Sequence, residues 1–336
     1  MPSVGIVRGF GEGYIATGYV IKLIKALNRR FRSKITFEEL VCGDYIKHGS
    51  SLSFDVIKQM GNYDTIYMGD MYSVSNPLEY TFSDIAYSLG DNIQYTCVSG
   101  FDKWSGTDIA IASYFDGGAR MRETSDNRDG CVETRVCSSF AMKNIAKHVI
   151  RHCETRRRRL AFVKDGDIEY CANGFYRAFE NFALPLSNFK LIRFTPRDIC
   201  REMMYAPRDF DVIFASDSFS EAVLGMFEFM MKESFAFYYH FGSDVPVYAL
   251  RATGANSASG DYTPSLCSYI IALSDMLKNE FDMAKEAAQL RLAIDYAVEN
   301  GATSDKGEEF VSMVIEGLRK DVTTKYSKRP PSRYIR

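Results

Sequence analysis

Apolar residues along the chain follow two different spacings. Short runs with few polar interruptions predict buried strands at residues 4–8, 36–42, 64–69, 108–112, 160–163 and 210–214. Apolar residues three or four positions apart predict helices at residues 19–31, 54–60, 139–152, 174–184, 220–234, 266–277, 283–300 and 306–318. Because strands and helices alternate, the sequence predicts an α/β fold.

One of these predicted helices, at residues 220–234, is apolar on nearly every side. From Ala222 to Met231 its only charged residue is Glu228. A helix of this kind is buried on more than one side, so we expect it to lie at a subunit interface. No apolar run reaches the ~18 residues that a membrane-spanning helix needs, so no membrane span is expected.

Several short segments carry a resemblance when they are taken in order. The first strand runs into a glycine-rich turn, and later segments repeat the order and spacing of one enzyme family. These segments are Gly9-Phe10-Gly11-Glu12-Gly13, residues 37–43 followed by His48-Gly49 and Leu52, residues 63–70, Asp116-Gly117-Gly118, residues 164–168 and residues 210–221. Over roughly residues 4–318 the chain resembles the isocitrate/isopropylmalate dehydrogenase family of β-decarboxylating dehydrogenases.

The resemblance implies a two-domain α/β fold that is not a Rossmann fold. The glycine turn lacks the G-x-G-x-x-G spacing of a dinucleotide fingerprint. A discontinuous large domain is expected from residues 1–93 and 244–318, and a smaller one from residues 94–243. The small domain would contain a dimerisation arm at about residues 114–136 and the interface helices, and a basic tail at residues 319–336 would follow.

The chemistry of the family is only partly represented at the matching positions. Its members hold a 2-hydroxy diacid with arginines, and the resemblance places these positions on Asp84, Gln94 and Ser113. An aspartate at the first position would repel a diacid. The catalytic tyrosine falls on Arg120, which does not lose its proton near neutral pH. Substrate binding of the family kind is therefore not expected.

The metal and cofactor positions are altered as well. The family's metal aspartates fall on Arg197, Glu221 and Gly225, and one carboxylate beside a cation does not make a site for Mg²⁺ or Mn²⁺. The adenine-side loop of the family matches a segment without its histidine or aspartate, at the positions Gly254, Asn256, Gly260 and Thr263. We expect no cofactor, the alternative being NAD with Mg²⁺ or Mn²⁺.

Lys164 is the one catalytic residue that clearly remains. It is either a group that moves protons, as in the family, or simply a lysine after a strand. Asp198 adjoins Arg197, so a shift of one residue would restore one metal carboxylate. In the family this lysine and this aspartate reach into the neighbouring subunit's site. A chain that keeps only these two could therefore complete the site of a partner.

The chain resembles the family along most of its length but lacks most of the family's catalytic residues. This combination favours a catalytically degenerate protein that serves as a structural or regulatory subunit. Its partners would be a second copy, a catalytic paralog or a larger assembly. The alternatives are an atypical NAD(P)-dependent oxidative decarboxylase, or a diverged enzyme with a new anion or nucleotide pocket. That pocket would be formed by Arg120, Arg122, Lys164 and Arg197.

Composition adds a few limits. The formal net charge of −2 over 336 residues favours neither nucleic acid nor an acidic membrane. The eight cysteines are scattered without a C-x-x-C pair, which indicates free thiols in a reducing, intracellular compartment. Through the resemblance the mitochondrial matrix is plausible, with the cytoplasm as the alternative.

Two basic segments have simple explanations. The four arginines at 156–159 follow a predicted helix, where positive charge offsets the helix dipole, so a solvated helix end is expected. The basic tail is either a frayed, solvated end or a strap that docks on an acidic partner. His148 and His152 are expected on the helix surface, without a third metal ligand.

Overall fold

The computed structural model describes most of the chain. The described residues are 1–9, 11–40, 54–70, 93–101, 104, 106–114, 120–127, 130–137, 139–164, 181, 190–231, 235–242, 245–250, 265–303 and 306–320. The tail beyond Lys320 and the helix predicted at 174–184, apart from residue 181, lie outside them. No described helix is long and apolar enough to cross a membrane.

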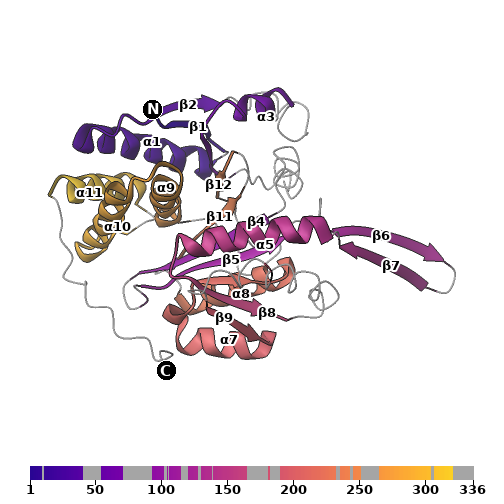
Figure 1. Ribbon diagram of the computed structural model, residues 1–336. Coiled ribbons are helices and arrows are strands. Elements are labelled where there is room, and N and C mark those ends of the chain that lie inside the picture. The colour runs from indigo at the N-terminus through magenta and orange to yellow at the C-terminus, as the bar shows by residue number, and fades with distance from the viewer. Residues whose placement is uncertain are drawn as a thin grey trace.

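Ten strands form one continuous sheet (Figure 1). In spatial order they are β2 (Thr36–Leu40), β1 (Ser3–Val7), β3 (Thr65–Met68), β12 (Val247–Ala249), β11 (Phe235–Phe241), β4 (Ile93–Gly100), β5 (Asp108–Tyr114), β10 (Val212–Phe214), β8 (Arg159–Val163) and β9 (Lys190–Phe194). The pairs are parallel except in the middle, where β11 runs antiparallel to β12 and β4, and β4 antiparallel to β5. The predicted α/β architecture is confirmed.

Helices cover both faces of the sheet. One face is covered by α1 (Glu12–Phe31), α5 (Ser139–Glu154), α9 (Leu266–Phe281), α10 (Ala284–Glu299) and α11 (Gly307–Lys320). The other face is covered by α3 (Phe54–Met60), α7 (Pro196–Tyr205) and α8 (Asp217–Met231). Strand residues alternate between the two cores, as Phe162 and Val163 do, because successive side chains of a strand point to opposite faces.

A two-stranded hairpin projects away from the sheet beside the start of α5 (Figure 1). Its strands are β6 (Arg120–Asn127) and β7 (Gly130–Cys137), which pair antiparallel from Arg120 opposite Cys137 to Asn127 opposite Gly130. The projecting arm expected at about residues 114–136 is thus a β-ribbon at this position. Its role in dimerisation stays a prediction.

The sheet order bears on the expected division of the chain. Strands β1, β2, β3 and β12, from residues 1–93 and 244–318, lie together at one end of the sheet, and the six strands from residues 93–241 lie at the other. Because one sheet joins the two groups, the boundary between domains stays a prediction. The strand order makes β5, β10, β8 and β9 neighbours in the sheet.

The sequence pattern did not predict β4, β9, α7, β11 or β12, and it predicted the segment of β6 and β7 only as an arm. Strands β4 and β11 are buried on both faces, so they lack the alternation of a half-exposed strand. Helix α7 had a signal that pointed to it. Thr195 caps the helix by accepting a hydrogen bond from the amide of Asp198, and Pro196 stands at the first helical position.

Candidate functional site

Four parallel strands, β5, β10, β8 and β9, end along the same side of the sheet, which we call the carboxyl edge. Backbone pairing fixes the alignment, since Ala112 lies opposite Phe214, Phe214 opposite Phe162, and Val163 opposite Phe194. Open α/β sheets bind ligands outside the carboxyl ends of their strands. The carboxyl edge is therefore where a functional site of this fold is expected.

Two of the expected substrate positions meet at this edge. Gln94 at the start of β4 lies directly opposite Ser113 at the end of β5. Both residues are buried, with 5% of Gln94 and none of Ser113 exposed to solvent. A neutral amide and a hydroxyl thus occupy positions where the resemblance expects two arginines. This pair carries no charge with which to hold a diacid.

Helix α8 begins just beyond the end of β10 and carries two of the expected metal positions. The carboxylate of Glu221 accepts a hydrogen bond from the hydroxyl of Tyr239 at 3.3 Å. One turn later stands Gly225, where an added Cβ would meet no atom within 4 Å. A carboxylate side chain would therefore fit at position 225. Packing therefore does not require glycine at position 225.

The start of α7 holds the third metal position. Arg197 is exposed in the first turn, and the neighbouring Asp198 takes part in the helix cap. Its Oδ2 accepts a hydrogen bond from the hydroxyl of Thr195 at 2.7 Å, and its Oδ1 lies 3.5 Å from the guanidinium of Arg201. The Asp198 carboxylate is thus engaged by its own helix.

Lys164 follows the last residue of β8 at the same edge. The backbone amide of Lys164 donates a hydrogen bond to the carbonyl oxygen of Phe194 at 2.9 Å, and Lys164 is exposed to solvent. This bond brings Lys164 beside the residues that open α7, including Arg197 and Asp198. The structure therefore gathers Gln94, Ser113, Lys164, the start of α7 and the start of α8 along one edge.

The remaining expected site residues are only partly described. Asp84, Gly254, Asn256, Gly260 and Thr263 lie outside the described residues. Arg120 opens β6, and only its backbone is described.

The donor set at the carboxyl edge does not fit Mg²⁺ or Mn²⁺, which need several carboxylate oxygens at short range. Glu221 is bonded to a tyrosine, Asp198 caps a helix, and glycine and arginine occupy the other two positions. Throughout the described ranges, no group of three or more histidine, cysteine, aspartate or glutamate residues could hold a metal ion.

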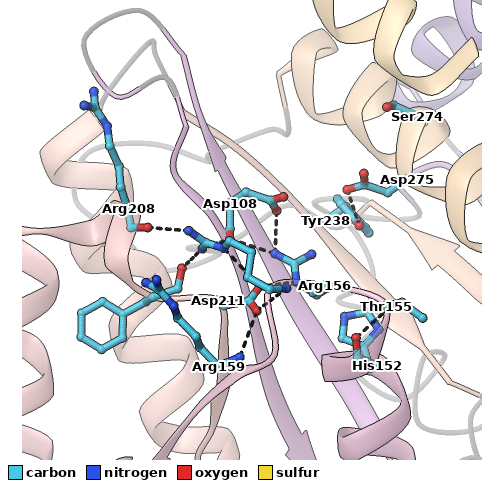
Figure 2. A network of polar contacts seen from close by, with 12 residues as sticks. Asp108, His152, Thr155, Arg156, Arg159, Arg208, Asp211, Tyr238, Ser274 and Asp275 are labelled. Carbon is cyan, nitrogen blue, oxygen red and sulfur yellow. Dashed lines mark hydrogen bonds and ion pairs between the residues drawn. The ribbon is translucent and has the colours of Figure 1, made fainter. Parts of the chain in front are cut away.

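The opposite ends of these strands, where β5, β8 and β10 begin, carry a network of ion pairs and hydrogen bonds (Figure 2). We call this side the amino edge. The Nε of Arg156 donates to Oδ1 of Asp211 at 2.9 Å, and one of its terminal nitrogens lies 2.9 Å from Oδ1 of Asp108. The second oxygen of Asp211 accepts a bond from the amide of Arg157. Asp211 itself is only 1% exposed.

This cluster corrects the expectation of a solvated helix end at residues 156–159. The side chain of Arg156 is 11% exposed, and Arg157 donates to the carbonyl oxygens of Arg208 and Phe210. Burial alone raises the pKa of Asp108, but the nearby charges of Arg156 and Arg291 outweigh it and hold that pKa well below its ordinary value. No local sequence pattern predicts this cluster, because Asp108 and Asp211 are distant from each other and from Arg156 in the sequence.

A second polar contact, between Asp275 and Tyr238, lies near this cluster (Figure 2). Asp275 of α9 accepts a hydrogen bond from the hydroxyl of Tyr238 at 2.7 Å and pairs with Arg291 of α10. Burial lowers the pKa of Arg291, but the carboxylates of Asp275 and Asp108 raise it by more, so the guanidinium stays charged. These bonds join two helices to the middle of the sheet.

Two histidine rings lie in the same region and form an aromatic stack. His240 of β11 lies between Tyr248, at 4.5 Å between ring centroids, and Tyr95, at 5.5 Å. The ring of His152 packs on Tyr95 at 4.3 Å, which corrects the expectation that it lies on the helix surface. Burial lowers the pKa of His240 to about 4, so the ring is neutral at pH 7.

The described cysteines agree with the expectation of free thiols. Cys97, Cys153, Cys200 and Cys267 form no disulfide, and all but Cys200 are buried. Burial raises the pKa of the Cys97 and Cys267 thiols to about 12, so these groups are poor nucleophiles near pH 7.

Comparison with known proteins identifies the fold. No protein-family model matches the sequence, and no curated protein matches it significantly. Among solved structures, a β-decarboxylating dehydrogenase from Thermococcus kodakarensis matches with a TM-score of 0.79 at 15% identity, over 98% of this chain and 100% of that one. An isocitrate dehydrogenase from Methylococcus capsulatus matches with a TM-score of 0.72 at 14% identity, over 95% and 100% of the two chains.

A protein from Thermus thermophilus also matches, with a TM-score of 0.72 at 12% identity, over 94% of this chain and 68% of that one. At these identities the match establishes the fold. The resemblance drawn from the sequence motifs and the structural likeness therefore agree on a β-decarboxylating dehydrogenase fold.

Proposed function

We propose, starting from the fold that this chain shares with β-decarboxylating dehydrogenases, that it is a catalytically degenerate protein of this type. It serves as a structural or regulatory subunit of a homo-oligomer, of a hetero-oligomer with a catalytic paralog, or of a larger assembly. In this role the scaffold presents surfaces to partners, while the carboxyl edge performs no oxidation.

The observation that supports this proposal most is the state of α8. Position 225 has room for a carboxylate and holds glycine, while Glu221 is bonded to Tyr239. Beside it, the uncharged pair Gln94 and Ser113 is buried in the sheet. Gln94 and Ser113 supply no positive charge that could hold a diacid, and the described carboxylates Asp198 and Glu221 do not form the ligand set of a metal that would stabilise an enolate.

The outer face of α8 supports the assembly part of the proposal. Its inner face packs on the sheet through Val223, Leu224, Phe227 and Met231. On its outer side Phe229 is 79% exposed, with Met226 and Met230 half-buried nearby. An aromatic side chain in that position is expected to be covered by a second copy or a paralog.

The test of catalysis is nicotinamide reduction by the purified chain with Mn²⁺. Isocitrate, isopropylmalate, malate and tartrate would be assayed with NAD and NADP, alone and with a family paralog from the same cell. We expect no turnover from the chain alone. Stimulation or altered substrate affinity in the mixture identifies a regulatory subunit, whereas turnover by the chain alone contradicts the proposal.

The test of assembly is the change Phe229→Glu, followed by sedimentation or light scattering. A buried carboxylate at the interface is expected to convert the oligomer to a monomer, because its desolvation is not compensated. Tyr205→Glu is the matched control, since Tyr205 at the end of α7 is 83% exposed and the same charge is added. An oligomer that survives Phe229→Glu, or dissociates equally with Tyr205→Glu, removes α8 from the interface.

One observation favours a second candidate, a diverged enzyme with an anion pocket. The bond from Lys164 to Phe194 brings Lys164 and Arg197 to neighbouring strand ends, where two cations would bind a phosphate or carboxylate. A thermal shift with phosphate that disappears in Arg197→Ala would support this pocket. No shift with phosphate or with a nucleotide would leave the subunit proposal in place.

A further inference from the structure

A groove of about 470 Å³ lies between α1 and α11, far along the sheet from the carboxyl edge of β5, β8, β9 and β10. We call it the basic groove. Its lining residues are Lys22, Lys25, Ala26, Arg29 and Arg30 of α1, and Ile315, Leu318 and Arg319 of α11. Five of the eight carry a positive charge at pH 7, and the other three are apolar.

Parallel packing of the two helices creates this concentration of charge. Near the start of α11, an added Cβ at Gly307 would lie 2.7 Å from the ring of Tyr19, and Glu308 pairs with Lys22 at 2.8 Å. Further along, Leu318 and Arg319 line the groove with Arg29. The two helices therefore run in the same direction, and their C-terminal turns come together.

Helix dipoles account for only part of the charge. Arg29, Arg30 and Arg319 lie in the last turns of their helices, where a cation is favoured. Lys22 and Lys25 lie near the middle of α1, where the dipole has no such effect. Their spacing places them on the face of α1 that also carries Arg29, and that face lines the groove.

The carboxylates of the described chain leave most of this charge uncompensated. Glu308 pairs with Lys22, and Glu316 pairs with Lys320 outside the groove lining. Among the described residues, Lys25, Arg29 and Arg319 form no ion pair within 4 Å, although Lys25 lies over the ring of Phe37 and the charge of Arg319 acts on Glu316. Each of these three side chains is exposed, so each is available to an approaching anion.

We propose that the basic groove docks an acidic amphipathic helical segment of a partner protein. Acidic side chains of the partner would pair with the rim residues Lys25, Arg29 and Arg319. Its apolar residues, one helical turn apart, would cover Ala26 and Ile315, which are half-buried in the free chain. Helices bind grooves in this way, with apolar anchors at the floor and charges that fix orientation.

Two features of the groove favour a peptide over a nucleic acid. Single-stranded nucleic acids are held by aromatic side chains on which bases stack, and the lining residues are aliphatic or basic. The apolar side chains at the floor of the groove also have neither the positive charge nor the hydrogen-bond donors that would bind the phosphates of a nucleic-acid backbone. The chain's own tail does not suit the groove either, because residues 321–336 carry five basic residues against one aspartate.

The experiment uses the full chain and a synthetic probe. The probe is a labelled helical peptide with glutamates on one face and leucines on the other, and its binding is followed by fluorescence anisotropy. We expect Lys25→Glu with Arg29→Glu to weaken binding by about tenfold or more, since two attractive charge pairs become repulsive. Raising the salt concentration should weaken the wild-type complex as well, because the rim charges are exposed.

The matched control is Lys58→Glu with Arg151→Glu, which reverses two exposed charges on α3 and α5 and should leave binding unchanged. Two further probes test the partner class: a polyglutamate peptide and a single-stranded oligonucleotide, each with the charge of the amphipathic peptide. Both should bind more weakly. Equal loss in the control variant, or equal or tighter binding of either probe, overturns the proposal, as does the absence of binding by the amphipathic peptide.

Discussion

The two ends of strand β5 differ in how they use polar side chains. At its start, Asp108 belongs to a cluster in which Arg156 and Asp211 are buried and fully paired. At its end, Ser113 faces the uncharged Gln94, along the edge where open α/β sheets bind their ligands. One strand thus joins a buried ion-pair cluster at its start to an uncharged buried pair at its end.

The difference shows that this chain tolerates buried charge where partners surround it. At the amino edge Arg156 pairs with both Asp108 and Asp211, and Asp211 is also bonded to the amide of Arg157. Among the described residues of the carboxyl edge, Gln94 and Ser113 are uncharged, and the acids Asp198 and Glu221 are bonded to neighbours within the protein. Among the described residues, the buried ion pairs of β5 and its neighbours thus lie at the amino edge.

The largest effect is expected from Asp211→Asn at the amino edge. This change leaves the buried guanidinium of Arg156 short of a counter-charge and should cost about 3–5 kcal/mol of unfolding free energy. Urea denaturation at pH 7 measures the loss. The same substitution at the carboxyl edge, Asp198→Asn, should cost within about 1 kcal/mol, because that carboxylate is half-exposed. Equal losses would remove the distinction between the edges.

The buried His240 predicts how the middle of the sheet responds to acid. Its folded pKa of about 4 lies below the ordinary value near 6.5, so folding favours the neutral ring. Stability from this group is therefore complete above pH 6.5 and is lost as the pH falls toward 4, by about 3 kcal/mol at most. Around the ring lie Tyr95, Tyr248, His152 and the carboxylate of Glu280.

His240→Phe should flatten the pH dependence of unfolding between pH 6.5 and 4, because a similar ring remains in the stack but no longer binds a proton. Urea denaturation at several pH values gives the slope directly. His148→Phe is the control, since His148 is exposed and should leave the slope unchanged. A slope that persists in His240→Phe would assign the acid sensitivity to other groups.

A smaller effect is expected from Thr195→Ala at the start of α7. The hydroxyl of Thr195 accepts a hydrogen bond from the backbone amide of Asp198 and donates one to its carboxylate. Removal of this hydroxyl should cost about 1 kcal/mol of unfolding free energy. Thermal unfolding measures it. Thr155→Ala is the matched control, because Thr155 is exposed and its hydroxyl bonds only to the preceding turn. A loss of several kcal/mol would mean that Thr195 does more than cap the helix.

The smallest effect is expected from Gly225→Asp, which returns a carboxylate to an open position on α8. An added Cβ meets no atom there, and aspartate is a slightly better helix former than glycine, so stability should change by less than about 0.5 kcal/mol. Thermal unfolding with and without Mn²⁺ tests this and the metal site together. Because Arg197 and the bonded Glu221 remain, Mn²⁺ should add no stability; a clear Mn²⁺ shift would contradict the proposed loss of the metal site.

Local patterning determined much of the fold. Apolar runs located the strands β1, β3, β5 and β8, and helical spacing located the helices α9 to α11. Patterning failed at β4 and β11, which are buried on both faces, and it placed Gln94, Ser113 and Lys164 at catalytic positions only through resemblance to a family. Sequence motifs identified the residues but carried no information on what contacts them.

Tertiary structure decided the rest, because contacts between distant residues have no local signature. The arginines at 156–159 looked like a solvated helix end, and only the meeting of β5 with β10 buries Arg156 between Asp108 and Asp211. The basic groove likewise exists only because α1 and α11, almost 300 residues apart, pack in parallel. The amino-acid sequence alone determined which side chains this protein has; the packing of its sheet and helices determined which charges are neutralised and which remain exposed.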